Sequence, residues 1–466
     1  MSDSEEENTS LNYYDRTDSN EESNENSDEE SNENSNSNSN SVSTYNSNDE
    51  TDGENDGTED VAEYVAKGGF GCVVKPALAN VIDGAKVRFK RTVSKIFKSQ
   101  KSYTDAVEAS GKAFNIMGKD PGHKVTTYKR TFMGSNLKKA TRKGCRILGR
   151  KPIYPIRMND LGKDISKIED YYKQLRDVPF VTIFKGIVKI FHQVKRAHDA
   201  GYIHGDIRQT NVMVIPETGR LTLIDFDWFL PKDEFLEDYK EKLGFYNNPP
   251  EVFLYWYNRT PQIGTYALNS KMQDYVTYTN EARVTPISLS ELDEANVANY
   301  NYFFTPTVKA LHATERWKLL QKLLFKTFDS YGLGFTIQRL IRYMYPGKLD
   351  GRITNRGVPY SDAELAIIED IVLNLNGLLD KMVQLKVEGR IVIKDAYSMI
   401  KELLNEYKDK VLVATAPKTP PMRAKPSTPL SPKAPPPSPK PSTPLSPKAP
   451  PPSPVSNRKT RRRARH

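Results

Sequence analysis

The chain has 466 residues, a formal net charge of +9 and only two cysteines, Cys72 and Cys145. So few cysteines argue against a disulfide scaffold or a cysteine-rich zinc site, and they fit a reducing compartment. The acidic start carries no apolar leader, and no run of about 18 apolar residues occurs, so we expect a soluble, intracellular protein that does not enter a membrane.

Charge divides the chain into three regions. Residues 1–60 hold 20 Asp and Glu against one Arg, a net charge of −19, whereas residues 416–466 hold 12 Lys and Arg and no acid. The middle region, 61–415, therefore carries +16. A basic middle suits a partner that bears phosphates, either a nucleotide or a polymer.

We expect both ends to be disordered tails. Residues 1–60 are Ser, Asn, Asp and Glu with few apolar side chains, so burial cannot offset the entropy of ordering, and a solvating or an acidic docking tail results. Residues 425–439 read KPSTPLSPKAPPPSP and recur at 440–454, which favours an extended polyproline spacer. The basic cluster at 458–465 either binds nucleic acid or another polyanion, or is a plain basic terminus.

The middle region begins with strand patterns. Residues 61–98 alternate in the manner of strands around a Gly turn, after which 102–118 takes helical spacing. A further strand is expected at 151–158. A long helix is expected over 181–200, where apolar side chains form a stripe.

Helix patterns then dominate. A hairpin is predicted first, because apolar runs at 212–215 and 221–224 flank a turn. Helices follow at 317–328, 335–344, 361–379 and 395–407, the third beginning at a capping box of Ser361 and Glu364. Strands followed by helices predict an α+β fold of two lobes, with the functional site in the cleft between them.

A glycine-rich segment lies between the first two strand patterns. Gly68 and Gly71, followed by Val73, suit a loop whose backbone approaches phosphates closely and folds over them, with Phe70 at its tip. A plain hairpin turn is the alternative, since Ala66 occupies the first glycine position. The candidate ATP-binding residues of this segment are Val65, Ala66, Lys67, Gly68, Gly69, Phe70, Gly71, Cys72 and Val73.

Lys95 is the candidate lysine for the nucleotide phosphates. It lies in the strand pattern Thr92-Val-Ser-Lys-Ile-Phe97, where Lys90 and Lys98 are its competitors. Such a lysine needs a carboxylate from a helix to hold it. Glu108 is the candidate, because it lies on the helical stretch and reaches further than Asp105; a solvated surface position is the alternative.

The segment His204-Gly-Asp-Ile-Arg-Gln-Thr-Asn211 follows the long helix and precedes a short strand. Asp206 would accept or orient the proton of an attacking hydroxyl, and Asn211, five residues on, would hold a metal ion. Arg208 is placed to neutralise charge on a transferring phosphoryl group. These three residues are therefore candidates for catalysis and metal binding.

Asp225 ends the next strand, in Leu221-Thr-Leu-Ile-Asp-Phe-Asp-Trp228. An aspartate in this position binds a Mg²⁺ ion that bridges phosphates. Asp227 follows two residues later. It either adds a carboxylate near the metal or serves as a hydrogen-bonding turn residue, which is the interpretation we prefer.

In chain order, these segments resemble the eukaryotic-type protein kinase superfamily over residues 61–408. Two later segments add to the resemblance: Pro249-Pro-Glu251, and Asp329-Ser-Tyr-Gly-Leu-Gly334, which resembles the start of the buried helix that supports the catalytic loop. Arg390 is a candidate partner for Glu251, with a surface position as the alternative. The chain is most similar to divergent serine/threonine kinases of large DNA viruses, the iridoviruses in particular.

The resemblance implies a bilobal protein-kinase fold, with a β-rich N-lobe over 61–158 and a helical C-lobe over 159–408. It implies ATP and two Mg²⁺ ions, or Mn²⁺ in their place, in the cleft. The implied reaction moves the γ-phosphate to Ser or Thr hydroxyls of protein substrates. The implied location is the host cytoplasm or nucleus, or a virion.

The chain departs from the family pattern at several positions. Gly205 stands where an arginine precedes the catalytic aspartate, Asp227 replaces a glycine, and an insertion falls within 257–315. Two other functions remain open. A small-molecule phosphotransferase of the aminoglycoside or choline kinase type also favours His-Gly-Asp, although it lacks the Pro-Pro-Glu segment. A basic scaffolding or nucleic-acid-binding protein with a vestigial kinase fold is the other.

Overall fold

The structure is a computed structural model, in which the described residues are mixed α and β. The predictions for both tails, 1–60 and 416–466, lie outside the described residues. The described residues are 63–68, 71–75, 77–78, 80–82, 85–87, 91–120, 124–127, 145, 154–235, 248–252, 272–277, 279–280, 286–346 and 353–415.

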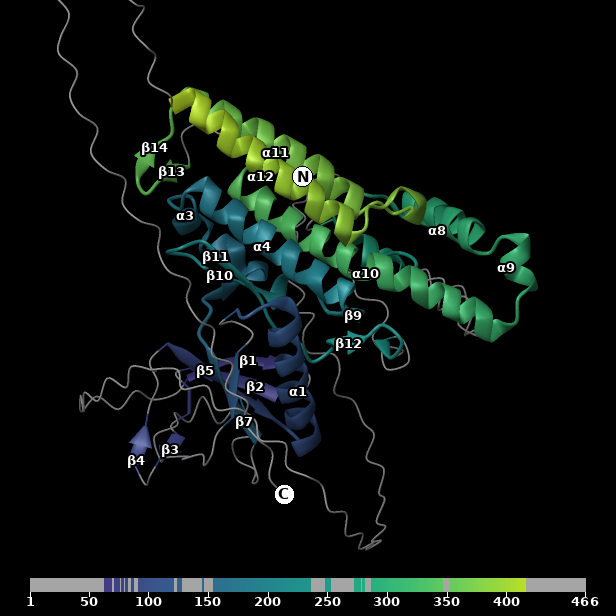
Figure 1. Cartoon of the computed structure of the whole chain (residues 1–466), viewed down its shortest axis with the longest axis horizontal. Helices are drawn as coiled ribbons and strands as arrows, with labels where there is room; N and C mark the ends of the chain where they lie inside the picture. Colours follow the sequence, from purple (N-terminus) through teal and green to yellow (C-terminus); the bar gives the residue numbers. More distant parts are fainter. Residues whose placement is uncertain are drawn as a thin grey trace, which may run out of the picture. The chain divides into compact units, whose positions relative to one another are not determined.

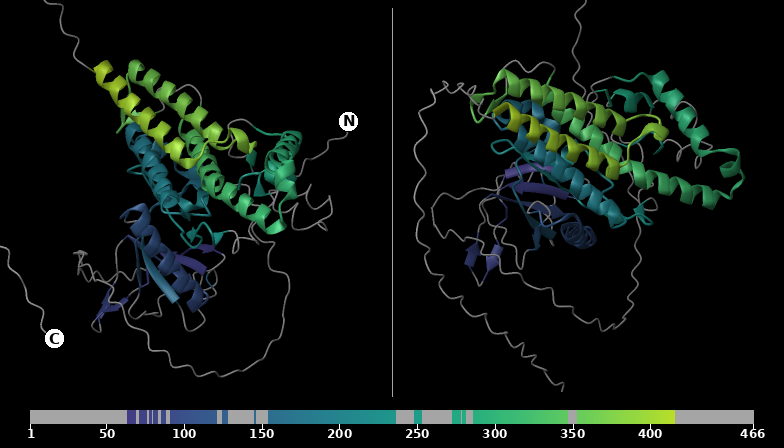
Figure 2. Two further views of the ribbon diagram at one scale, coloured as in Figure 1. Left: turned by 45° about the vertical axis from the view of Figure 1, so that its right-hand side comes forward. Right: turned by 45° about the horizontal axis from the view of Figure 1, so that its top comes forward.

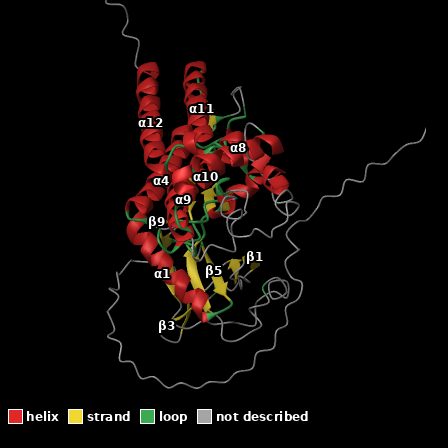
Figure 3. Cartoon of the chain, turned by 90° about the vertical axis from the view of Figure 1, so that its right-hand side faces the viewer, coloured by secondary structure: helices red, strands yellow, loops and turns green. Residues whose placement is uncertain are grey.

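An antiparallel sheet forms from the first part of the chain, in the strand order β1-β2-β5-β7-β6. Figure 1 labels four of these strands, β1, β2, β5 and β7. Helix α1 (Gln100–Met117) packs against it through Tyr103, Ala106 and Val107, which contact Phe97 and Ile156 of the sheet (Figure 3). The strands are β1 (Glu63–Gly68), β2 (Gly71–Lys75), β5 (Thr92–Phe97), β6 (Val125–Thr127) and β7 (Tyr154–Asn159), and a separate pair is β3 (Asn80–Ile82) with β4 (Ala85–Val87).

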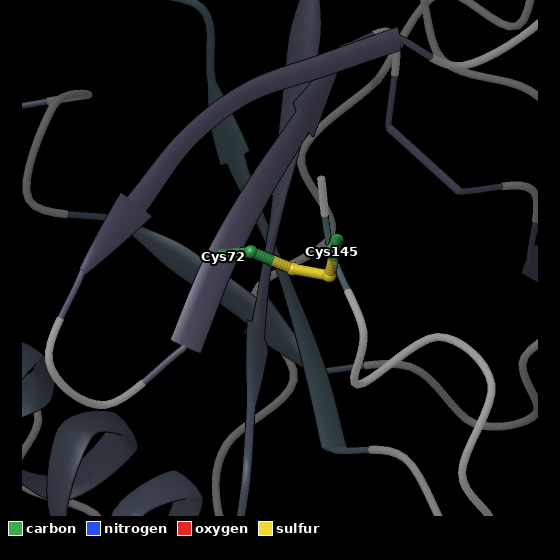
Figure 4. The surroundings of a disulfide bond; sticks show 2 residues. All are labelled: Cys72 and Cys145. Atoms are coloured by element: carbon green, nitrogen blue, oxygen red, sulfur yellow. A yellow bond between two sulfur atoms is a disulfide. The ribbon is translucent and has the colours of Figure 1, made fainter. Parts of the chain in front are cut away.

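A disulfide joins Cys72 on β2 to Cys145, and both residues are buried (Figure 4). The sequence argued against a disulfide scaffold, which a single bridge does not make, and it did not predict this pair. Two cysteines 73 residues apart carry no spacing signature, and only the folded chain brings their Cα atoms to 5.9 Å. The bridge links β2, which begins within the glycine-rich segment, to a residue 73 positions further along the chain.

Removing the bridge should lower the free energy of unfolding. In a Cys72→Ser/Cys145→Ser variant we expect a loss of about 2–4 kcal/mol, because the unfolded chain regains the freedom of the loop that the bridge closes. Urea unfolding with and without dithiothreitol measures the loss. Dithiothreitol should lower the free energy of unfolding of the parent protein and leave that of the variant unchanged. If the parent protein, denatured without reductant, showed two free thiols, the bridge would be contradicted.

The second part of the chain is mainly helical. Helices α4, α10, α11 and α12 pack against one another (Figures 1 and 2). The predicted apolar stripe of α4 is confirmed, because Ile183, Ile187, Ile190, Phe191 and Val194 are all buried. The helices are α3 (Tyr172–Leu175), α4 (Phe180–Asp199), α8 (Leu289–Phe303), α9 (Pro306–Ala310), α10 (Ala313–Met344), α11 (Asp362–Met382) and α12 (Ile393–Thr415), with 3₁₀ turns η2 (Ile165–Asp170), η3 (Gln209–Asn211) and η4 (Val387–Gly389).

Helix α10 is one continuous helix of 32 residues, where the sequence predicted two. The predicted break covered Asp329-Ser-Tyr-Gly-Leu-Gly334, whose glycines are poor helix formers. Packing overrides that preference, because a Cβ at Gly334 would lie 2.7 Å from the Cβ of Met382 on α11. The glycine lets the two helices approach closely, which favours the continuous helix.

The predicted capping box at Ser361 is confirmed. Its hydroxyl accepts the N–H of Glu364 at 3.3 Å, and the Glu364 carboxylate accepts the N–H of Ser361 at 3.0 Å. Helix α12 continues to Thr415, so the folded region extends beyond the predicted boundary at residue 408. None of the helices in the described part of the chain has the length and apolarity needed to cross a bilayer.

The remaining strands are short and lie outside the five-stranded sheet. The predicted hairpin at 212–215 and 221–224 is confirmed as β10 (Val212–Ile215) paired with β11 (Arg220–Leu223). The other short strands are β8 (Lys163–Asp164), paired with β10, β9 (Tyr202–Ile203) with β12 (Leu230–Pro231), and β13 (Thr354–Asn355) with β14 (Val358–Pro359). The segment from β9 to β12 contains most of the candidate site.

Candidate functional site

Asp206, Arg208 and Asn211 lie together between β9 and β10. The Asn211 amide Nδ2 donates to the Asp206 backbone carbonyl at 2.8 Å and to its carboxylate Oδ2 at 2.9 Å. The Arg208 Nε lies 3.3 Å from Asp206 Oδ1. The carboxylate of Asp206 is thus oriented from both sides, by an amide and by a guanidinium.

Asp329 on α10 anchors the backbone just before Asp206. Its fully buried carboxylate accepts the N–H groups of His204 at 2.7 Å and Gly205 at 3.0 Å, and lies 3.0 Å from His198 Nε2. Burial opposes ionisation of Asp329, but the hydrogen bonds from the two histidines outweigh it and hold its pKa below the usual value. The predicted support of this loop by the Asp329 segment is confirmed.

The ring of His204 connects the two aspartate segments. Its Nε2 lies 3.2 Å from the Ile224 carbonyl, and its Nδ1 accepts the N–H of Asp206 at 3.3 Å. This arrangement assigns a neutral ring with its proton on Nε2. Burial lowers the pKa of His204, which agrees with the neutral form. The ring therefore fixes Asp206 relative to the strand that leads to Asp225.

Gly205 is required by the shape of the backbone. Its φ is +76°, and a Cβ there would lie 2.8 Å from the Phe235 ring and 3.0 Å from the Trp228 carbonyl. An arginine at this position, as in the resembling family, would be both strained and crowded. The departure at Gly205 thus has a packing reason.

A Gly205→Ala variant should lose about 1–3 kcal/mol of unfolding free energy, from left-handed strain and from contact with Phe235. Gly201→Ala is the matched control, because Gly201 has a similar φ of +77° and no atom within 4 Å of its would-be Cβ. Urea unfolding of both variants separates the two causes. Equal losses would show that crowding at Gly205 contributes nothing.

Asp225 lies at the end of β11 beside Asn211. The N–H of Ile224 donates to the Asn211 carbonyl at 2.9 Å, which brings the two predicted metal ligands onto adjacent backbone. Asp225 itself has φ +64°, an uncommon value for a residue other than glycine. The buried Phe226, whose ring is 5.1 Å from that of His204, helps to hold this conformation. Backbone strain of this kind is concentrated at functional sites.

Lys95 meets two carboxylates. Its Nζ lies 2.9 Å from Asp225 Oδ1 and 2.8 Å from Asp227 Oδ2. Burial disfavours the ammonium, but the two carboxylates outweigh it and raise the pKa of Lys95 above its usual value. Burial opposes ionisation of Asp225 as well, but Lys95 lowers its pKa. Burial and the adjacent Asp225 instead raise the pKa of Asp227. The sequence thus placed Lys95 and Asp225 at one site correctly.

The glycine-rich segment forms the β1–β2 hairpin. Gly68 pairs with Gly71 across it, and Val73 on β2 lies opposite Lys95 on β5. Gly71 has no room for a side chain, because a Cβ would lie 2.0 Å from the Ile96 carbonyl oxygen. The second strand of the hairpin, β2, therefore pairs directly with the strand that carries Lys95.

Part of the glycine-rich segment lies outside the described residues. Gly69 and Phe70 lie outside the described residues, as do the side chains of Ala66 and Lys67. Val65 is exposed. The side chain of Cys72 is engaged in the disulfide, so its predicted contact with ATP cannot involve a free thiol.

The predicted pair of Lys95 and Glu108 is wrong in this structure. Glu108 points away from the sheet on α1, its side chain is 62% exposed, and it pairs with Lys112 at 2.7 Å. The buried face of α1 consists of Ala106, Ser110, Ala113 and Met117, to which position 108 does not belong. Glu108 was chosen because it lies on the helical stretch and reaches further than Asp105. Which face of α1 is buried did not enter that choice.

Asp227 makes a contact that the sequence did not predict. It lies in a turn in which the Phe229 N–H donates to the Phe226 carbonyl at 2.9 Å, which agrees with the turn role we preferred, and its carboxylate also binds Lys95 across 132 residues of sequence. The one available signal was the second acid of the Asp-Phe-Asp triplet. Hydrogen bonds over such a separation depend on tertiary structure and leave no local pattern.

Glu251 and Arg390 form a fully buried ion pair, which decides between the two alternatives that the sequence left open for Arg390. The Thr327 hydroxyl donates to the same Glu251 oxygen at 2.8 Å, and the Arg390 guanidinium lies over the Tyr331 ring, 5.1 Å from its centroid. The pair connects the Pro-Pro-Glu segment to the chain just before α12. Such a clamp holds parts of the chain that are far apart in sequence.

No protein family model matches this chain, and no curated protein matches it. The kinase resemblance therefore rests on the motifs and on the geometry of the residues they contain. A cavity of about 480 Å³ elsewhere, lined by residues of α8 and the end of α11 such as Glu291, Ala295 and Val383, includes none of these site residues.

Proposed function

We propose that the protein is an ATP-dependent serine/threonine-protein kinase. The observation that carries the proposal is the convergence of three separate segments on one site. Lys95 of the sheet meets Asp225, and Asp225 adjoins the loop in which Asn211 orients Asp206. A phosphate-binding cation, a base and oxygen ligands in this order suit phosphoryl transfer. The packing of Asp329 against the loop supports the same function.

Each residue has a separate task in this proposal. Asp206 accepts or orients the proton of the substrate hydroxyl, and Arg208 beside it offsets negative charge on the transferred group. Lys95 binds the nucleotide phosphates through its ammonium. The β1–β2 hairpin covers those phosphates with its backbone. Catalysis then consists mainly of positioning and of charge stabilisation.

The residues present fit a divalent cation. Asp225 and Asp227 share the single ammonium of Lys95, so these three side chains sum to one negative charge. Carboxylate and amide oxygens are the ligands that Mg²⁺ and Mn²⁺ accept, and Asn211 supplies an amide. Asp225 and Asn211 would hold the ion, which would neutralise charge on the phosphates.

The proposed fold is bilobal, with the sheet and α1 in a β-rich N-lobe over 61–158 and the helices in a C-lobe over 159–408. Lys95 comes from the proposed N-lobe, and Asp206 and Asp225 come from the proposed C-lobe. A bilobal kinase fold places its phosphate-binding lysine and its catalytic and metal-binding residues in the same way. The insertion within 257–315 includes α8 and α9. Phe303 and Phe304, at the end of α8, pack near Ile203, which precedes His204.

The second candidate function is phosphorylation of a small molecule, which the His204-Gly-Asp206 sequence and the second acid, Asp227, favour. The buried pair of Glu251 and Arg390 favours a protein substrate instead, because it stabilises the Pro-Pro-Glu segment that docks peptides in the resembling family. Protein hydroxyls remain the proposed acceptor for this reason.

The proposed partners are protein substrates, together with nucleic acid or another polyanion at the basic C-terminal tail. An intracellular location, in host cytoplasm, nucleus or virion, stays a prediction. The disulfide weighs against a compartment that keeps thiols permanently reduced. No membrane partner is proposed.

The direct test is to incubate the purified full-length chain with γ-labelled ATP, Mg²⁺ and protein substrates. A second reaction offers choline and an aminoglycoside. We expect label on serine and threonine, identified by mass spectrometry. Label on the small molecules alone would favour the second candidate, and no transfer to any acceptor would contradict both.

A further inference from the structure

Helix α1 offers no carboxylate to Lys95. Tyr103, Ala106 and Val107 pack against the sheet, and the other buried residues of the helix are Ser110, Ala113 and Met117, none of them acidic. The two acids of the helix, Asp105 and Glu108, are both exposed. A lysine that must present its ammonium to phosphates therefore has to be held from elsewhere.

The sheet fixes the backbone of Lys95 and leaves its ammonium to be positioned. Lys95 pairs with Val73 on β2 and with Ile156 on β7, so it belongs to a central strand with neighbours on both sides. Its side chain is only 16% exposed. Its Nζ donates to the carboxylates of Asp225 and Asp227.

The two carboxylates are not equivalent. Asp225 adjoins Asn211 and is a candidate metal ligand, so a bound cation would compete with Lys95 for its oxygens. Asp227 is the less exposed of the two, at 14% against 33%, and its contact with Nζ is at least as short. Asp227 is thus the carboxylate that stays available to the lysine when Asp225 binds a metal ion.

We propose that Asp227 is the positioning residue for Lys95, in the role that sequence reasoning gave to Glu108. The inference rests on the proposed function, since it assumes that Lys95 binds nucleotide phosphates. It follows that Lys95 is held by the segment that also carries Asp225, and that the lysine is positioned without any carboxylate from α1.

The test measures the binding of ADP with Mg²⁺ by calorimetry, and KM for ATP and kcat separately, on the full-length chain. Asp227→Asn should weaken nucleotide binding about 10- to 100-fold, as expected for one lost charge-assisted hydrogen bond. Asp227→Glu should restore part of the affinity. Asp227→Ser is a second variant if the amide disturbs folding, which circular dichroism reports.

A double-variant cycle separates positioning from a merely structural role. If Asp227 acts through Lys95, then Asp227→Asn should add nothing to the loss in a Lys95→Met background. Asp199→Asn is the matched control, because Asp199 also pairs with a lysine, Lys195, but on the surface. Glu108→Gln tests the rival carboxylate directly and should bind nucleotide as the parent does.

The outcomes distinguish this inference from the proposed function. A parent chain that binds nucleotide and transfers phosphate, together with an unaffected Asp227→Asn variant, would overturn the positioning role alone. Additive losses with Lys95→Met, or a loss in Glu108→Gln equal to that in Asp227→Asn, would do the same. A parent chain that binds no adenine nucleotide would overturn both.

Discussion

Replacing Asp206 by asparagine should lower turnover at least about 100-fold, because loss of a general base of this kind costs two to four orders of magnitude. Asparagine keeps the shape of the side chain and can still contact Asn211. It cannot take the proton of the substrate hydroxyl, and it removes the negative charge beside Arg208. The loss should therefore appear in kcat, with nucleotide binding little changed.

The measurement is the initial rate of label transfer from ATP at saturating substrate, alongside urea unfolding. Asp199→Asn serves as the control, since it removes a surface carboxylate and should transfer label at the parent rate. An Asp206→Asn variant with near-parent turnover and an intact fold would show that the catalytic loop is assigned wrongly. Polyanion binding that survives this variant would separately indicate a scaffolding role for the tail.

Local elements could be predicted from the sequence because their signals are local. The stripe of α4, the hairpin of β10 and β11 and the capping box at Ser361 depend on residues a few positions apart. Asp206 and Asn211, five residues apart in one loop, are close in the structure for the same reason. Their chemical roles are predictions that the Asp206→Asn variant tests.

The remaining features depend on contacts between distant segments. Cys72 meets Cys145, and Lys95 meets Asp227, over 73 and 132 residues, and no periodicity reports such pairs. The role given to Glu108 was wrong for a related reason, since the buried face of α1 is known only once the helix is packed on the sheet. Family resemblance nevertheless suggested some distant contacts, such as that of Asp329 with the loop before Asp206 and the buried pair of Glu251 and Arg390.

That buried pair leads to the second large expected effect. Arg390→Met should lower the free energy of unfolding by about 3–5 kcal/mol, because it leaves the Glu251 carboxylate buried without its cation. The backbone carbonyl of Gln384, which accepts the Arg390 Nε at 3.0 Å, loses its partner as well. Methionine fills a volume similar to that of arginine. The loss of unfolding free energy is therefore due to the missing charge and not to a cavity.

Urea unfolding at neutral pH measures the effect, with Arg339→Met as the matched control. Arg339 pairs with Glu169 at 2.7 Å, but the Glu169 side chain is 49% exposed, so water can solvate the carboxylate that remains and a smaller loss is expected. A double variant, Glu251→Gln/Arg390→Met, should recover part of the loss, since it removes the unpaired buried charge. If Arg390→Met and Arg339→Met were equally mild, the clamp would contribute no more than a surface pair, and the argument from the Pro-Pro-Glu segment to a protein substrate would lose its support.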